Sequence, residues 1–348
     1  MNKKAKIIKP KKKFNWSKIA PYFKSLYNNQ VATELGLTKK WYVALIVALI
    51  SVIISLIPTT VSAATAKGSA FLNTSANYNY DEGFYSFLED AKNNNYDLTF
   101  DETTHESKLT GITTSTANNY LLYNHKILKS DGAIFSDFQV YYIDSKNMDS
   151  HLLQNTIETI VSSKVNSLDG RDCSFLIFTS NTFITRLYKP KAYNAVGGVY
   201  GDFTNLSKEQ SKLSNLFVSK SQTRLENVSE TLNNFKGFVD NVYINTRKTV
   251  ALTQTGIIGA VNAGIVLLMG FVLFLLTRGK NNPNRGIKFQ QCFNIAYWTT
   301  LSPALIALVV GFIVSAYQVM LFVIVFGFRT MWLSMKTLSP NNPPVVKK

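Results

Sequence analysis

Three histidines and one cysteine are the residues of this sequence best suited to catalysis or metal binding. His105, His125, His151 and Cys173 all fall between residues 62 and 252. A cysteine beside a histidine would supply a nucleophile and its base, and histidines together would ligate a metal. The spacing supports neither, because the sequence has no His-x-x-x-His, Cys-x-x-Cys, Gly-x-Ser-x-Gly or Gly-x-x-x-x-Gly-Lys motif. The sequence therefore favours a protein that is not an enzyme and that has no catalytic, cofactor-binding or metal site.

The segment that carries these residues is flanked by long apolar runs, which are typical of a membrane protein. The chain has 348 residues, 46% of them apolar, and the apolar residues are clustered. Each run exceeds the roughly 20 residues needed to cross a hydrocarbon core of about 30 Å, and the last is long enough to cross twice. We therefore expect four transmembrane helices, over residues 41–61, 253–277, 293–314 and 315–335.

The net charge of +16 is concentrated beside these runs. Residues 1–40 carry eleven lysines and one glutamate, and residues 278–288 and 329–348 each carry four basic residues and no acid. The stretch between the first two spans holds 18 basic and 20 acidic residues. This pattern follows the positive-inside rule and is not the footprint of a nucleic-acid-binding protein, so we expect no nucleic acid partner.

The charge pattern predicts an orientation in the plasma membrane. Both termini, the basic loop 278–292 and a disordered tail over 336–348 are expected to be cytoplasmic, because translocating basic flanks is unfavourable. Residues 62–252 are then extracytoplasmic. Cys173 falls outside the membrane and Cys292 at its inner edge, so the two cannot form a disulfide within one chain. We expect Cys173, which begins an apolar run, to be a small core residue.

The first apolar run has two interpretations, a retained span or a cleaved signal peptide. Residues 61–63 (VSA) form a small-x-small cleavage site after the helix-breaking Pro58. The basic, amphipathic segment 1–40 is longer than a signal peptide requires, which favours a retained span. This segment contains FNWSKIAPYFKSLY and is expected to lie on the anionic inner leaflet of the lipid bilayer. The residues expected to contact that surface are Lys11, Lys12, Lys13, Trp16 and Phe23.

Residues 62–252 are expected to form one compact domain. Helical spacing predicts helices over 81–93 and 148–168, the second of which would cover a sheet. Short aromatic and β-branched runs between polar turns predict strands over 96–102, 106–113, 119–128, 133–144, 173–180 and 183–188. The fold class is therefore a membrane all-α protein with four transmembrane helices and an inserted extracytoplasmic α+β domain.

A helical stalk is predicted at the end of this domain, over residues 207–250. Ser207 and Gln210 form a capping box, which is a signature of a helix start. The predicted helix has an apolar seam along one side. This seam either pairs with a second chain or packs on the chain's own domain, and both alternatives stay open. We expect the stalk to continue without a break into the second span. Its apolar residues recur at spacings of three and four, at Leu225, Val228, Leu232, Phe235, Val239 and Val242.

Small residues and one arginine are the candidate contacts within the spans. Gly256, Ala260 and Gly264 form a small-x-x-x-small face that packs helices closely, either within this chain or between the copies of a homo-oligomer. Pro303 should kink the third span. Arg329 is expected to snorkel to the inner interface or to contact a lipid headgroup or a partner protein. The spans contain no acidic residue, which argues against ion-coupled transport by this chain alone.

Both ends of the chain carry a family resemblance. The segment YFKSLYNNQVATEL, with residues 25–27, precedes the first span, and RGIKFQQCFNIAYWTTLSPALIALVVGF contains Tyr297, Thr300 and Pro303. These segments resemble a family of multi-pass membrane proteins of unknown function in Firmicutes and their relatives. Some members are named for maltodextrin utilisation, and the membrane part is distantly similar to the Yip family. The resemblance implies the architecture and offers no catalytic residues.

These features predict a non-enzymatic membrane protein whose extracytoplasmic domain binds a partner protein or ligand. We expect it to be an accessory subunit of a membrane complex, such as the sugar-uptake permease that the family name suggests. The alternatives are an oligomeric transport or lipid-handling component in its own right, and an extracytoplasmic enzyme. The enzyme would require the histidines and Cys173 to converge.

Overall fold

The chain folds into two compact units. The computed structural model describes residues 16–73, 80–112, 119–128, 134–165, 172–188, 199–220, 223–314 and 317–339. The helical unit combines residues 1–63 with residues 251–348, and the α/β unit comprises Ala64–Val250. Lys11, Lys12 and Lys13, expected at the membrane surface, lie outside the described residues.

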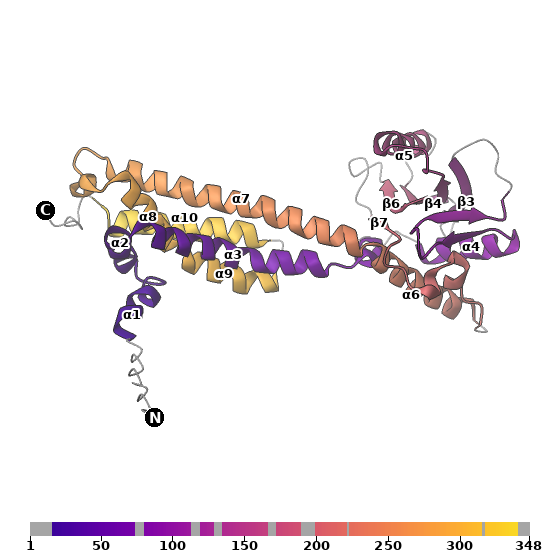
Figure 1. The fold of residues 1–348 in the computed structure, drawn as a ribbon, viewed down its shortest axis with the longest axis horizontal. Helices are drawn as coiled ribbons and strands as arrows, with labels where there is room; N and C mark the ends of the chain where they lie inside the picture. The colour runs from indigo at the N-terminus through magenta and orange to yellow at the C-terminus, as the bar shows by residue number, and fades with distance from the viewer. Residues whose placement is uncertain are drawn as a thin grey trace, which may run out of the picture. The chain divides into compact units, whose positions relative to one another are not determined.

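The described residues include four helices that are long and apolar enough to cross a membrane. The shortest has 19 residues, and at about 1.5 Å per residue it extends about 28 Å, close to the thickness of a hydrocarbon core. These helices are α3 (Trp41–Thr65), α7 (Ile244–Thr277), the pair α8 (Phe289–Thr299) and α9 (Leu301–Ile313), and α10 (Gln318–Lys336). Two short helices, α1 (Trp16–Lys24) and α2 (Asn29–Thr38), precede them (Figure 1). The expectation of four helices capable of spanning is confirmed.

The third of these spans is interrupted, as expected from Pro303. The helix α8 ends at Thr299, Thr300 forms a bend, and α9 begins at Leu301. Proline has no backbone N–H, so Pro303 cannot donate to the carbonyl of Thr299 four residues earlier. That carbonyl must take its hydrogen bond from another group.

Glycines allow two close helix contacts in the helical unit. A Cβ added at Gly36 of α2 would lie 2.7 Å from the Cα of Ile295 in α8. A Cβ at Gly311 of α9 would lie 3.0 Å from the ring of Pro58 in α3 and 2.9 Å from the Cγ of Gln318. Because these distances are shorter than side chains tolerate, the packing depends on the missing Cβ atoms.

Two polar pairs join α3 to α7. The side-chain amide of Asn262 donates to the hydroxyl of Ser55 over 3.1 Å, and the hydroxyls of Thr60 and Thr255 lie 2.8 Å apart. Asn262 and Ser55 are almost fully buried. Buried polar groups are costly without a partner, so these pairs favour one register of α3 against α7.

A five-stranded mixed sheet forms the centre of the α/β unit. Its strand order is β3-β4-β5-β6-β7, with β4 parallel to β5 and the other neighbours antiparallel. The helix α5 (Ser150–Val165) lies between β4 and β5 in the sequence, as a parallel pair requires a crossover. A two-stranded sheet pairs β1 (Asp97–Phe100) with β2 (Ser107–Thr110). The strands of the large sheet are β3 (Asn119–Leu128), β4 (Ile134–Ile143), β5 (Asp172–Thr179), β6 (Thr182–Tyr188) and β7 (Tyr200–Asp202).

Both faces of the large sheet are buried at the interior strand β4. Successive side chains of a strand point to opposite faces, and in β4 the residues Phe138, Val140 and Tyr142 belong to one core. Tyr141 and Ile143 belong to the other core, together with residues of α5. The second half of the strand, residues 140–143 (VYYI), is therefore apolar without alternation, because neither face of β4 is exposed there.

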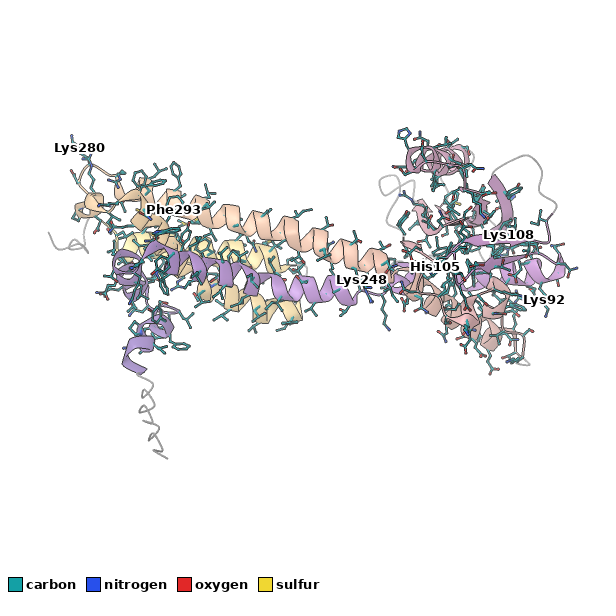
Figure 2. All side chains as sticks on the ribbon, in the orientation of Figure 1. Lys92, His105, Lys108, Lys248, Lys280 and Phe293 are labelled. Atoms are coloured by element: carbon teal, nitrogen blue, oxygen red, sulfur yellow. The ribbon has the colours of Figure 1, made fainter. Side chains whose placement is uncertain are left out.

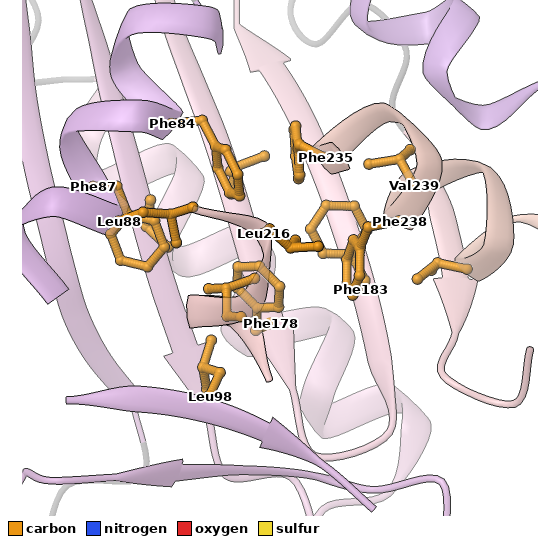
Figure 3. Close-up of a cluster of buried hydrophobic side chains, with 14 of the residues drawn as sticks. Phe84, Phe87, Leu88, Leu98, Phe178, Phe183, Leu216, Phe235, Phe238 and Val239 are labelled. Carbon is orange, nitrogen blue, oxygen red and sulfur yellow. The ribbon is translucent and has the colours of Figure 1, made fainter. Parts of the chain in front are cut away.

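Two helices, α4 (Tyr80–Asn93) and α6 (Arg224–Val242), contribute to the larger core. The rings of Phe84 in α4 and Phe235 in α6 stack with centroids 3.8 Å apart, and Phe183 of β6 meets Phe238 of α6 edge to face at 5.6 Å. Figure 3 shows these aromatic rings facing one another between the helices and the sheet. Aromatic burial of this extent supplies a large share of the hydrophobic stabilisation of the unit.

The structure corrects the predicted stalk over residues 207–250. The capping box at Ser207 is present, but it begins only the 3-10 turn Lys208–Gln210, and the long helix α6 begins at Arg224. Its apolar seam faces the chain's own domain, since Phe235, Val239 and Val242 are fully buried there. A turn at Tyr243 separates α6 from α7. The heptad-like spacing thus reflects packing on the domain itself.

The two ends of the α/β unit are joined to each other, in a contact that we call the clasp. The side chain of Asp240 in α6 accepts a hydrogen bond from the backbone N–H of Ser69 over 2.8 Å. The guanidinium of Arg247 donates to the carbonyl of Ala66 over 3.4 Å. The segment that follows α3 therefore contacts the end of α6 and the first turns of α7.

Candidate functional site

The structure places the three histidines and Cys173 on four different elements. His105 lies in the turn between β1 and β2, His125 on β3 beside Tyr123, and His151 in the first turn of α5. Cys173 is fully buried at the start of β5. Among the residues that the structure describes, no group of three or more His, Cys, Asp or Glu is placed to hold a metal ion. This arrangement gives no support to a catalytic centre built from these residues.

A groove between α5 and the β6–β7 edge of the sheet is the best candidate for a binding site in the α/β unit. We call it the α5 groove, and its cavity has a volume of about 500 Å³. Its walls are Ser150, Leu153, Gln154 and Ile157 of α5, Ile184, Thr185 and Arg186 of β6, and Val199 and Tyr200 at the start of β7.

The α5 groove has an apolar floor and a polar rim. Ile157 and Ile184 are buried and belong to the core beneath α5. At the rim, Arg186 lies 3.6 Å from the carboxylate of Glu158, and the side chain of Tyr200 is 54% exposed. An apolar surface with a few hydrogen-bonding groups at its edge is the usual composition of a ligand-binding cleft.

The sequence reading identified the buried face of α5 but not the groove beside it. The helical spacing of residues 148–168 puts Leu153, Ile157 and Ile160 on one face; Ile157 and Ile160 lie in that core, and Leu153 is partly buried against it. Ser150 and Gln154 are spaced four residues apart at the margin of this face. Two polar residues spaced four apart beside an apolar stripe indicate the edge of the buried face of a helix. The opposite wall depends on the pairing of β6 with β7, which no local pattern reveals.

In the helical unit, Arg329 of α10 is held by the chain itself. Its Nε donates to Oδ1 of Asn29 over 3.2 Å, and its Nη1 donates to the carbonyl of Thr299 over 3.0 Å. The hydroxyl of Ser302 and the carbonyl of Ser25 accept further bonds. We call these five residues the Arg329 cluster. All three guanidinium nitrogens are engaged, so the structure assigns Arg329 an internal contact where the sequence suggested snorkelling or a lipid or partner contact.

The small-residue face of α7 is exposed among the residues that the structure describes. Gly256, Ala260 and Gly264 are exposed, and a Cβ added at either glycine would meet no atom within 4 Å. A different glycine of this helix, Gly259, faces Leu56 of α3. The face expected to pack helices is therefore not used for packing among the described residues, and its pairing with a second copy stays a prediction.

The residues expected at the membrane surface fall in or near α1. Trp16 begins α1, and the side chain of Phe23 is 57% exposed. An exposed aromatic ring in a short helix that precedes the first long apolar helix is compatible with an interfacial position.

No family model matches the chain, and neither a curated protein nor a solved structure matches it.

Proposed function

We propose that this protein is a non-enzymatic membrane receptor or accessory subunit whose α/β unit binds a partner protein or ligand in the α5 groove. The observation that carries this proposal is the groove itself, a cavity of about 500 Å³ with a buried isoleucine floor and a rim of hydrogen-bonding side chains. A ligand with one apolar side and a polar edge complements it.

The proposal places the α/β unit outside the plasma membrane, with both termini in the cytoplasm. Four helices of sufficient length and apolarity, with basic residues clustered at the flanks, support this orientation. The family resemblance of the two ends suggests that the helical unit associates with a larger membrane complex, for which a sugar-uptake permease is the first candidate.

A second candidate function is an oligomeric transport or lipid-handling component. The exposed face of Gly256, Ala260 and Gly264 favours it, because small residues in a membrane helix allow close approach of a second helix. This candidate predicts self-association of the helical unit, whereas the receptor proposal predicts an occupant of the α5 groove.

Site-specific photocrosslinking in intact cells tests the receptor proposal. A benzoylphenylalanine replaces Tyr200, which is aromatic and exposed at the rim of the groove. The matched control carries the same group at Leu225, which is 79% exposed on α6 and lies outside the groove. We expect a discrete adduct from position 200 that position 225 does not give.

A blocking variant makes the test specific to the groove. Gln154→Trp places an indole between α5 and β6 and should abolish the adduct at position 200 while leaving protein abundance unchanged. The mass of the adduct distinguishes a small ligand from a partner protein. Identical adducts from both positions, or an adduct that survives Gln154→Trp, would refute binding in the α5 groove.

A further inference from the structure

A second cavity of the α/β unit is lined by three lysines. It has a volume of about 450 Å³ and lies beside β1 and β2, and we call it the lysine pocket after Lys108, Lys146 and Lys212. The α5 groove shares no lining residue with it. Lys108 is labelled in Figure 2, together with His105 of the turn that precedes β2.

Strand pairing brings two of these lysines onto one face. In the β1–β2 register Thr99 stands opposite Lys108, and on its other side Thr99 forms an isolated antiparallel bridge with Lys212. Residues directly opposite one another in a sheet project to the same side. Adjacent backbones lie about 4.8 Å apart, so the two lysine backbones are about 10 Å apart with Thr99 between them. Two flexible ammonium groups at this separation can reach one small anion from both sides.

The third lysine is already paired. The ammonium of Lys146 lies 2.8 Å from Oε2 of Glu106, and the hydrogen bond and the charge of that carboxylate raise the pKa of Lys146. By contrast, Lys108 and Lys212 form no ion pair with any residue that the structure describes. Within the described parts of the chain, two of the three lysines of the pocket therefore have no carboxylate at ion-pair distance.

The other carboxylate at the pocket is directed into its own turn. Oδ1 of Asp101 accepts the backbone N–H groups of Thr103 and Thr104 at 2.8 and 2.7 Å, and these hydrogen bonds lower the pKa of Asp101. The turn is closed by a hydrogen bond from the N–H of Asp101 to the carbonyl of Glu106, and His105 within it has a φ of +55°. This geometry fixes Asp101 in the wall of the pocket and leaves Lys108 and Lys212 as its available charged donors.

We propose that the lysine pocket binds a phosphate group through Lys108 and Lys212. An ammonium group offers three donors, and a phosphate group has enough acceptor oxygens to engage both lysines at once. The hydroxyl of Ser211 lines the same pocket, and the volume accommodates a phosphate with a small organic substituent. The group belongs either to free phosphate or to a phosphodiester such as a glycerol-phosphate headgroup. This inference does not depend on the function proposed for the α5 groove.

Calorimetric titration of the full chain in a non-ionic detergent tests the proposal with two probes. Inorganic phosphate represents the free ion, and glycerophosphoglycerol represents the phosphodiester. We expect at least one probe to bind, with an affinity that falls as salt is raised. Tighter binding of inorganic phosphate identifies the free ion as the ligand, and tighter binding of the diester identifies a headgroup-like source.

Charge-removing variants locate the site. The double variant Lys108→Gln with Lys212→Gln should lower the affinity about tenfold or more, because each charge-assisted hydrogen bond contributes substantially to binding. The charge-conserving pair Lys108→Arg with Lys212→Arg should retain binding. The control Lys220→Gln alters an exposed lysine of the same unit outside the pocket and should leave the affinity unchanged. Failure of both probes to bind, or equal affinity in the glutamine double variant and the control, would overturn the proposal.

Discussion

Arg329 donates a hydrogen bond to the carbonyl of Thr299, the carbonyl that Pro303 leaves without a helical donor. The Nη1–O distance is 3.0 Å, and the two residues lie in different spans. The break between α8 and α9 is therefore linked to the charge in α10. Pro303 leaves the carbonyl of Thr299 without a helical donor, and Arg329 supplies a donor in its place. Bonds to Ser25, which follows α1, and to Asn29, the first residue of α2, extend the same contact to the two short helices.

Replacing Arg329 should destabilise the helical unit. Arg329→Met keeps an unbranched apolar stem but removes every donor, so the carbonyls of Thr299 and Ser25 lose their partner. Ser25 and Thr299 are fully buried, and leaving a buried acceptor unpaired costs about 2 kcal/mol. The measurement is thermal unfolding of the purified protein in detergent. Arg285→Met, at an exposed position, is the control, and equal unfolding temperatures for the two variants would mean that the Arg329 cluster does not stabilise the fold.

Two glycine-to-alanine changes should differ in their effect on stability. Gly36→Ala should destabilise the protein, and Gly264→Ala should not. Gly36→Ala places a methyl group 2.7 Å from the backbone of Ile295, and such overpacking costs about 1–3 kcal/mol. Gly264→Ala adds a methyl group where no atom lies within 4 Å, so it should cost nothing. Unfolding temperatures of the two variants, measured side by side, check this. A loss of stability in Gly264→Ala alone would show that the α2–α8 contact is not as described.

Self-association of the protein through α7 can be tested by enlarging a glycine of its small-residue face. If the face of Gly256, Ala260 and Gly264 pairs two copies, Gly264→Ile should reduce the oligomer, because close backbone approach requires small residues. Light scattering of the protein in detergent reports the oligomeric state, and Gly286→Ala, outside the membrane-spanning helices, is the control. Pairing through this face would be excluded by either of two results. The parent protein is monomeric, or it is an oligomer that Gly264→Ile leaves unchanged.

The proposed orientation can be tested with introduced cysteines. Cys173 and Cys292 form no disulfide with each other and are both buried, so the parent protein should react weakly with a membrane-impermeant maleimide. In intact cells we expect labelling of Ser162→Cys in α5 and no labelling of Lys280→Cys in the loop after α7. Permeabilised cells should label both. The reverse pattern in intact cells would invert the topology.

The basic N-terminal segment should bind anionic membranes. Each lysine near such a surface contributes at most about 1 kcal/mol, screened by salt. A peptide of residues 1–30 with Lys11, Lys12 and Lys13 changed to glutamine should therefore bind anionic vesicles more weakly than the parent peptide. Neutral vesicles are the control. Equal binding of the parent peptide to both vesicle types would leave these lysines with a role in orientation only.

Local patterns predicted the elements of this chain well. The strand expected over 119–128 coincides with β3, and the helix expected over 81–93 differs from α4 by one residue. These elements carry their signal in their own residues, through aromatic and β-branched runs or helical spacing. The apolar runs gave the four long helices for the same reason.

Features that depend on distant residues were not predictable. A capping box looks the same before a 3-10 turn as before a long helix, which is why the stalk was placed too early at Ser207. An apolar helix seam with heptad spacing can pack on a sheet as well as on a second helix. The contact of Arg329 with Ser25 joins residues about 300 positions apart, and the lysine pocket requires Lys212 to pair with Thr99. Such relationships arise only when the chain is folded.

Because of the clasp, the α/β unit is an insertion whose two ends lie close together. Because Ser69 is bonded to Asp240 and Ala66 to Arg247, residues 64–250 begin and end at neighbouring points. An insert that closes its own loop adds little conformational cost to the host chain, whatever its length. The segment between α3 and α7 can therefore be exchanged for another domain with adjoining ends, so that one helical unit could carry different recognition domains over evolutionary time.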